Sequence, residues 1–319
     1  MSAERELSPA PEGSYCAIGV DVGGTKIAAG IVTLPDARIH ARRIAPTLPQ
    51  RGGEPVFADV RHLIEELASE ARALNLEVRG LGIGVCELVD LAGDVVSANA
   101  IAWKGAPIQA RLAVFAPTVV EADVRAAALA EARFGAGRLF RTFLYLTVGT
   151  GISSCLVIEG KPFAGSRGAA GTIASSPLDS VCEKCGAVEG RTLEDIASGP
   201  ALVSRYNLNS GGRLSSGEEV TAAAGAGDPA AISVVQLGGE ALGRAAGFLV
   251  NTLDPEAVIV GGGLGLSGGI YWARFEGAAR RQIWSDLNRE LPIIPAGLGW
   301  DAGLIGAAAA AWLKSSPEL

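Results

Sequence analysis

Residues 18–26 end in side chains that can bind a phosphate group. They read Ile-Gly-Val-Asp-Val-Gly-Gly-Thr-Lys, an apolar run typical of a strand, followed by an acid and two glycines. Glycine lets the backbone turn closely and present its N–H groups to phosphate oxygens, and a tight hairpin turn without a ligand is the alternative. Asp21 is placed to hold a magnesium ion or its waters. The residues predicted to contact nucleotide here are Asp21, Gly23, Gly24, Thr25 and Lys26.

The residues after these glycines argue against two familiar phosphate loops. Residues 27–32 are again apolar and small, which suits the second strand of a hairpin. A Walker-type loop or a dinucleotide fingerprint would instead continue into a helix. A second turn of the same kind, Gly149-Thr150-Gly151, lies inside the alternating pattern of residues 143–158. The recurrence suggests that the chain contains duplicated halves.

The composition indicates a soluble globular protein of two domains. The 319 residues are 49% hydrophobic and 19% charged, and no apolar run is long enough to span a bilayer. The net charge is −7 without a cluster of lysine or arginine, so nucleic acid is not an expected partner. Five scattered cysteines, with no signal-peptide pattern at the N-terminus, predict a cytoplasmic location.

The predicted elements place these turns at strand ends. A β-meander is expected over 15–46, and short strands over 78–85, 117–121 and 257–260. Residues 164–190, rich in glycine and serine, are predicted to form a long functional loop. Helices are expected over 54–74, 124–134, 193–197, 217–224, 232–253 and 302–313.

Four motifs together resemble the ROK family of sugar kinases and related repressors, within the actin-like ATPase superfamily, and the resemblance covers residues 15–313. They are Asp21–Lys26, Glu121–Ala128, Thr147–Gly151, and the stretch from Asp254 to Gly261-Gly262-Gly263. The second and third correspond to the family's Glu-Asn-Asp-Ala-Asn-Ala-Ala-Ala and its second phosphate motif. The resemblance adds Thr147, Gly149, Thr150, Gly151, Gly261, Gly262 and Gly263 to the predicted nucleotide contacts.

This resemblance implies an α/β fold of two actin-like, ribonuclease H-like domains with a nucleotide cleft between them. The smaller domain would comprise residues 1–123 with 300–319, and the larger one residues 124–299. ATP and Mg²⁺ would be the cofactors, a small sugar or sugar analogue the substrate, and a homodimer the assembly.

Asp123 is predicted to be the catalytic base. Phosphoryl transfer depends mainly on positioning and charge stabilisation, and a base at the acceptor hydroxyl completes the machinery. By similarity to the family, Asp123 accepts the proton of a sugar hydroxyl. An N-cap of the following helix is the alternative, and the surrounding motif favours catalysis.

The predicted acceptor site departs from the family pattern. The family has asparagine where this chain has Ala122 and Arg125, and glutamate and histidine where it has Thr172 and Ser175. Asn99 and Glu194 do match the family pattern, although Asn99 can also be a simple turn residue. The predicted substrate residues are Asn99, Asp123, Thr172, Ser175, Glu194 and Glu87.

Glu87 stands where the family has proline and glycine. Its carboxylate can place a new charge near the substrate, which would suit an amine or an altered hydroxyl pattern. An ordinary solvated glutamate is the alternative.

The family's structural zinc site is doubtful in this chain. Cys182 and Cys185 remain, while Thr192 and Ser175 stand where the resemblance places the third cysteine and the histidine. A tetrahedral zinc site needs four ligands, so two free thiols are the alternative to a zinc site completed by carboxylates.

The resulting prediction is ATP-dependent phosphorylation of a primary hydroxyl on a sugar or sugar analogue. An aminosugar or a C7-cyclitol is favoured over plain glucose, because altered ligands imply altered specificity. An ordinary glucokinase and a non-catalytic sugar sensor are the alternatives. A repressor is not expected, because only about fourteen residues precede the first strand, too few for a helix-turn-helix domain.

Overall fold

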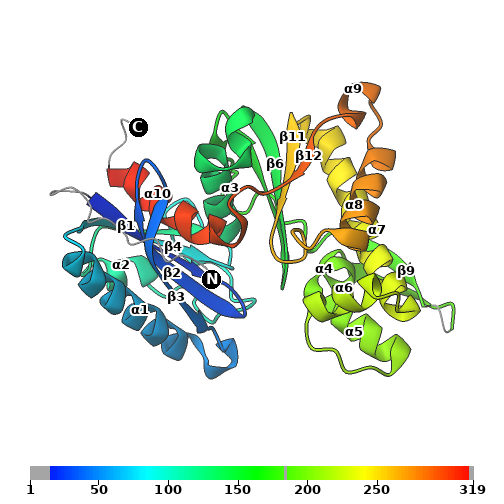
Figure 1. Cartoon of the computed structure of the whole chain (residues 1–319), viewed down its shortest axis with the longest axis horizontal. Helices are drawn as coiled ribbons and strands as arrows, with labels where there is room; N and C mark the ends of the chain where they lie inside the picture. The colour runs from blue at the N-terminus through cyan, green and yellow to red at the C-terminus, as the bar shows by residue number, and fades with distance from the viewer. Residues whose placement is uncertain (1–14, 183–184, 316–319) are drawn as a thin grey trace, which may run out of the picture. The chain divides into compact units, whose positions relative to one another are not determined.

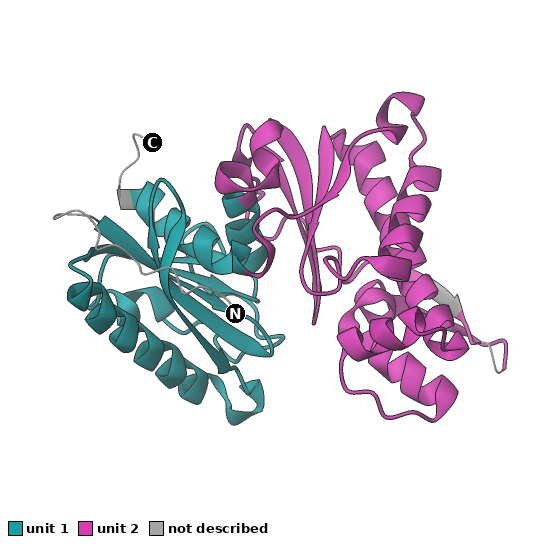
Figure 2. Ribbon diagram, viewed as in Figure 1, with its two compact units in different colours: residues 1–130, 301–319 teal, residues 131–300 magenta. Residues whose placement is uncertain are grey.

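A computed structural model describes residues 15–182 and 185–315. The chain divides into two compact units, which are coloured separately in Figure 2. Unit 1 is Met1–Ala130 with Asp301–Leu319, and unit 2 is Glu131–Trp300. Both are α/β, as the sequence predicts (Figure 1).

Unit 1 contains a five-stranded mixed sheet in the order β3-β2-β1-β4-β5. The first three strands form the predicted antiparallel meander, whereas β1, β4 and β5 run parallel. Their bounds are β1 Tyr15–Val22, β2 Lys26–Thr33, β3 Arg38–Pro46, β4 Glu77–Val85 and β5 Thr118–Ala122.

The two faces of this sheet differ because strand side chains alternate. Large apolar residues of β1 and β4, such as Ile18 and Leu81, share a core cluster with the buried face of α1 (Gly53–Ala73). The alternate positions include glycines, and there α10 (Ala302–Ser315) approaches closely. A Cβ on Gly82 would lie 1.7 Å from the carbonyl oxygen of Ala307. Glycine is therefore required where α10 packs on the sheet.

Unit 2 repeats this topology. Its sheet has the order β12-β11-β6-β7-β8, with β6, β7 and β8 antiparallel and β6, β11 and β12 parallel. Read from β8, this is the arrangement of β3-β2-β1-β4-β5, which confirms the predicted duplicated halves. The bounds are β6 Thr142–Val148, β7 Ile152–Ile158, β8 Lys161–Pro162, β11 Ala257–Gly261 and β12 Ile293–Pro295.

The helices of unit 2 include a close pair, α7 (Pro229–Leu253) and α8 (Gly269–Gln282). Glycines every fourth residue of α7 lie against α8, and a Cβ on Gly243 would be 2.3 Å from the carbonyl oxygen of Phe275. The other helices of the fold are α2 Ile108–Leu112, α3 Asp123–Phe134, α4 Glu194–Ala197, α5 Gly199–Ser210, α6 Gly217–Gly225 and α9 Asp286–Arg289.

The prediction of one long loop over residues 164–190 is wrong. This stretch contains β9 (Pro177–Val181) and most of β10 (Val188–Thr192), which pair antiparallel. The strands are short and their apolar residues sparse, so their pairing with each other, rather than an apolar pattern, defines them. Across the described part of the chain, we find no helix with the length and apolar character needed to span a membrane.

Candidate functional site

Three neighbouring strands of unit 1 end at one edge of the sheet, where predicted cofactor, substrate and catalytic residues follow them. In the parallel pairs, Asp21 lies opposite Gly84 and Val85 lies opposite Ala122. The first glycine turn, the segment from residue 86 and Asp123 therefore all leave from the carboxyl ends of β1, β4 and β5. Ligands of open α/β sheets bind at this kind of edge.

Asp123 is the first residue of α3 and is partly exposed. Its Oδ1 accepts the N–H of the next residue, Val124, at 2.6 Å, whereas an N-cap bonds to the donors one or two residues further on. Burial and, after it, the charge of Asp21 raise the pKa of Asp123, while the Val124 N–H opposes the shift, and the resulting pKa is about 7. Such a pKa suits a general base at neutral pH.

Asp21 lies against the start of α10. A Cβ on Gly303 would be 2.4 Å from its Oδ2, so only glycine fits beside this carboxylate. Burial raises the pKa of Asp21 and Lys26 opposes the shift, with a resulting pKa of about 6. A cation favours the ionised form of such an acid, so the residue fits the predicted magnesium role.

The first glycine turn is closed by one backbone bond and fastened by Thr47. The Gly23 N–H donates to the Lys26 carbonyl at 3.0 Å, and neither Gly23 nor Gly24 has a positive φ. The Thr47 hydroxyl donates to the Gly23 carbonyl at 2.7 Å, and its N–H donates to Thr25 at 3.0 Å. Thr47 is fully buried, and no local sequence signal identifies it.

We expect Thr47→Val to weaken ATP binding, because valine keeps the volume but leaves the Gly23 carbonyl without its hydroxyl donor. One lost hydrogen bond of about 1 kcal/mol corresponds to a roughly fivefold rise in the KM for ATP. Steady-state kinetics with ATP varied at saturating acceptor measure this change. The Thr47→Ser variant retains the hydroxyl and is the control; equal KM values for both variants would contradict the role.

The second glycine turn, Gly149-Thr150-Gly151, and a third one, Gly261-Gly262-Gly263, lie side by side in unit 2. Gly149 donates to the Gly151 carbonyl at 2.9 Å, and Gly261 on β11 pairs with Thr147 on β6. Gly262 has φ +81°, and a Cβ there would lie 2.4 Å from the Val148 carbonyl oxygen. The structure thus brings Thr147, Gly149, Thr150 and Gly151 next to Gly261, Gly262 and Gly263.

A cavity of about 340 Å³ adjoins the third turn. Its lining includes Glu218, Thr221, Ser267 and Tyr271, and a Cβ on Gly263 would be 3.3 Å from the Glu218 carboxylate. A space of this size beside the glycines fits the adenosine side that the sequence predicts there.

The predicted acceptor residues fall in both units. In unit 2, the Glu194 carboxylate accepts the Ile152 N–H at 2.8 Å, directly after the second glycine turn. The Thr172 hydroxyl donates to the Ala169 carbonyl at 3.0 Å, and Ser175 is exposed. In unit 1, Asn99 is exposed.

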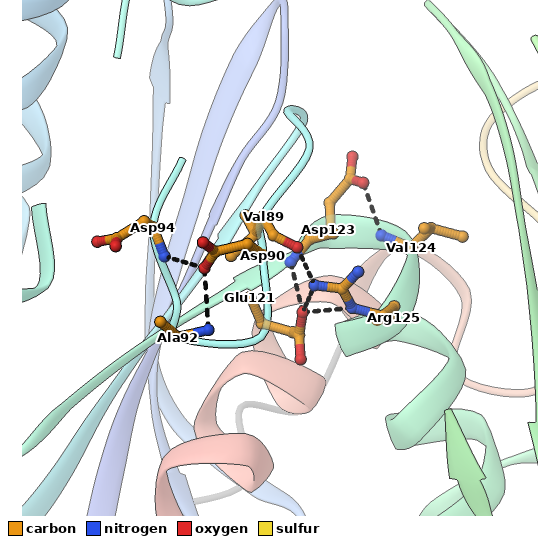
Figure 3. A network of polar contacts seen from close by, with 9 residues as sticks. Val89, Asp90, Ala92, Asp94, Glu121, Asp123, Val124 and Arg125 are labelled. Atoms are coloured by element: carbon orange, nitrogen blue, oxygen red, sulfur yellow. Dashed lines mark hydrogen bonds and ion pairs between the residues drawn. The ribbon is translucent and has the colours of Figure 1, made fainter. Parts of the chain in front are cut away.

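Arg125 does not face solvent. It is 4% exposed and donates to the Glu121 carboxylate at 2.5 Å and to the Val89 carbonyl at 2.7 Å (Figure 3). The same figure shows Asp90 accepting the N–H groups of the turn that follows it. Arg125 is therefore a structural link between α3 and the segment after β4.

The solvated alternative for Glu87 is wrong. Its side chain is 5% exposed, and its carboxylate accepts backbone N–H groups from residues 99–101. The residues around Glu87 show neither strand alternation nor helical spacing, so the sequence pattern does not predict that this side chain is buried.

The described residues do not fit a zinc site. Cys182 and Cys185 are not in a disulfide, and within residues 15–182 and 185–315 no group of three or more His, Cys, Asp or Glu side chains converges. Thr192, in the third cysteine's place, bonds to the Asp195 carboxylate at 2.7 Å.

Two five-stranded sheets of matching topology, with glycine turns at equivalent strand ends, define a two-domain protein of the actin-like ATPase fold. The sequence pattern of the ROK family matches residues 17–314, and this chain belongs to the ROK family. A glucokinase from Streptomyces coelicolor is 31% identical, with 91% of this chain and 96% of the relative covered. An N-acetylmannosamine kinase from Vibrio vulnificus is 29% identical, with the same shares covered.

A solved structure supports the same assignment. A ROK family glucokinase from Streptomyces griseus, in complex with glucose and AMPPNP, superposes with a TM-score of 0.81 and 30% identity. The match covers 93% of this chain and 99% of that chain. Fold and family are thus as the sequence motifs predict.

Proposed function

We propose that this chain transfers the γ-phosphoryl group of ATP to a primary hydroxyl of an aminosugar or a cyclitol in preference to plain glucose. The chain is an ATP-dependent sugar kinase, in keeping with relatives named glucokinase and N-acetylmannosamine kinase. The choice of acceptor is the part that we propose.

The residues have distinct roles in this reaction. Backbone N–H groups of the glycine turns other than those of Gly23 and Gly149 bind the phosphates, together with Thr25, Lys26 and Thr150. The third turn borders the adenosine. Magnesium, when bound with ATP, neutralises phosphate charge, and Asp21 is the residue that would hold it or its waters. Asp123 accepts the proton of the acceptor hydroxyl as the hydroxyl oxygen attacks the γ-phosphorus, and the bond from that phosphorus to the β,γ-bridging oxygen breaks to release ADP.

The observation that carries the choice of acceptor is the contrast between the residues predicted to bind phosphate and those predicted to bind the sugar. The glycine turns keep the family pattern, whereas Thr172 and Ser175 are short side chains where the family has a carboxylate and an imidazole. Arg125 is bonded to Glu121 and Val89, so it does not replace the asparagine that it displaces. Fewer and shorter ring ligands favour a substrate with other substituents than glucose.

An ordinary glucokinase is the second candidate, favoured by the relatives that carry this name. It would have to bind glucose through Asn99 and Glu194 with little help from residues 172–175. A non-catalytic sensor is disfavoured by the near-neutral pKa of Asp123, a property that binding alone does not need.

A panel of acceptors tests the proposal. ATP consumption would be measured with glucose, mannose, glucosamine, N-acetylmannosamine and C7-cyclitols, and the phosphorylated position assigned by NMR. We expect kcat/KM for an aminosugar or cyclitol at least about tenfold above that for glucose. Preference for glucose over every analogue would favour the glucokinase, and no turnover with any acceptor would favour the sensor.

The proposal includes a homodimer that works in the cytoplasm. No disulfide joins the five cysteines at 16, 86, 155, 182 and 185, which suits a reducing compartment. Sedimentation measurements would determine the assembly.

A further inference from the structure

The segment of residues 86–101, which we call the acceptor loop, follows β4 and contains Asn99. Glu87 in this loop and Arg125 on α3 stand where the family pattern has other residues. Both are buried, at 5% and 4% exposure, and both bond to backbone atoms of the acceptor loop. The two departures from the family therefore act on one segment.

The Glu87 carboxylate is saturated by donors from its own loop. Oε1 accepts the N–H groups of Ala100 at 2.6 Å and Ile101 at 2.8 Å. Oε2 accepts the Asn99 N–H at 2.9 Å and the hydroxyl of Ser97. Three consecutive N–H groups that converge on one carboxylate form an anion-binding nest occupied by a side chain of the same protein.

This arrangement changes the role that Glu87 can have. Because its four hydrogen bonds come from the loop, the carboxylate is not available to bind a sugar. The same bonds fix the backbone at Asn99 while the Asn99 side chain stays exposed. Glu87 thus acts on a substrate contact through the backbone.

Further bonds hold the rest of the acceptor loop. The Ser97 hydroxyl, which donates to Glu87, accepts the Leu88 N–H at 2.8 Å. Arg125 donates to the Val89 carbonyl, and just beyond the loop the buried Trp103 donates to the Gly53 carbonyl at 2.8 Å. The hydrogen bonds of the Glu87 carboxylate connect the start of the loop to its last three residues.

We propose that Glu87 is a positioning residue of the acceptor site, which fixes residues 97–101 so that Asn99 is presented to the acceptor. The proposal rests on the proposed function only for the identity of the bound molecule. Glu87 takes no part in proton transfer.

The charge of Glu87 also affects the pKa of Asp123, the predicted catalytic base. The titratable and charged groups around Asp123 are Asp21 with its neighbour Lys26, Cys86, Glu87 and Arg125. After burial and Asp21, Glu87 also raises the pKa of Asp123, whereas Arg125 lowers it. Neutralising Glu87 should therefore lower that pKa and move the acid limb of the rate profile to lower pH.

The Glu87→Gln variant tests the proposal because the amide keeps one acceptor oxygen and loses the other. We expect the KM for the acceptor to rise at least about tenfold, as for two lost hydrogen bonds, with the KM for ATP within about twofold of wild type. Amide hydrogen exchange of residues 97–101 should become about tenfold faster. The pH at half-maximal kcat/KM should fall.

Asp228→Asn is the matched control, since Asp228 caps α7 with a carboxylate that accepts the N–H groups of Ala230 and Ala231 in unit 2. It should change none of these quantities. Unchanged exchange at 97–101 in Glu87→Gln would overturn the proposal, as would faster exchange with an unchanged acceptor KM. If wild type turns over no acceptor, the proposed function fails, and the exchange rates still support or overturn the link between Glu87 and residues 97–101.

Discussion

Replacing Asp123 by asparagine is expected to lower kcat by about 10²- to 10⁴-fold, the usual contribution of a positioned general base. The amide has the size of the carboxylate but cannot accept the proton of the acceptor hydroxyl. The glycine turns do not depend on this side chain, so the KM for ATP should stay within about threefold. Steady-state kinetics with the best acceptor of the panel measure both constants.

The wild-type pH profile provides an independent check of this role. Because burial and the neighbouring Asp21 raise the pKa of Asp123 to about 7, kcat/KM should rise with pH and be half-maximal near pH 7. Asp21 and Asp123 titrate as a coupled pair, so the profile reports the pair. The profile of Asp123→Asn should lose this limb, and a residual activity with the same limb would assign the base to another residue.

Folding controls for this variant follow from the sign of the pKa shift. A carboxyl whose folded pKa lies above its unfolded value stabilises the protein most at low pH, and that stability is lost as the pH rises through the folded pKa. Asp123→Asn should therefore be at least as stable as wild type at pH 8. If Asp123→Asn had a lower melting temperature than wild type at pH 8, its loss of activity would be explained by unfolding.

The second large effect is expected at Gly82. In Gly82→Ala the new methyl group would lie 1.7 Å from the Ala307 carbonyl oxygen and 2.2 Å from its carbon. Both are backbone atoms, so no side-chain rotation relieves the overlap, and α10 must move off the sheet. We expect unit 1 to lose roughly 3–5 kcal/mol of stability, measured by denaturant unfolding.

Gly84→Ala is the matched control on the same face of β4. A Cβ there meets its nearest atom, the Asp123 Cα, at 3.6 Å, an ordinary contact. Its stability should change by less than about 1 kcal/mol. Equal losses in the two variants would mean that β4 rejects alanine for a reason other than the contact with α10.

Much of the fold can be predicted from the sequence because strand and helix periodicity are local. The meander, the long helices and the repeated glycine turns all follow from patterns within a few residues, and the matching sheet topologies confirm them. The hairpin of β9 and β10 escapes prediction, because its short strands are defined by each other. The domain boundaries at residues 123 and 300 stay predictions.

The site is predicted less completely, for a physical reason. Chemistry-bearing residues in motifs, such as Asp21 and Asp123, stand out by type and spacing. Thr47, Glu87 and Arg125 act by bonding to backbone atoms of other segments, and that partnership is visible only in the folded chain. Family comparison marks Glu87 and Arg125 as unusual, but it does not reveal their burial.

The position of α10 in the sequence has a consequence for synthesis on the ribosome. The helix that covers the glycine face of the unit 1 sheet is separated from that sheet by residues 131–300, which form the whole of unit 2. At about 5–20 residues per second, a ribosome needs on the order of ten to thirty seconds to add this stretch. During that time β1 and β4 have been made while their covering helix does not yet exist. Unit 2 can thus complete its fold while the nascent sheet of unit 1 still exposes the glycine face that α10 will cover.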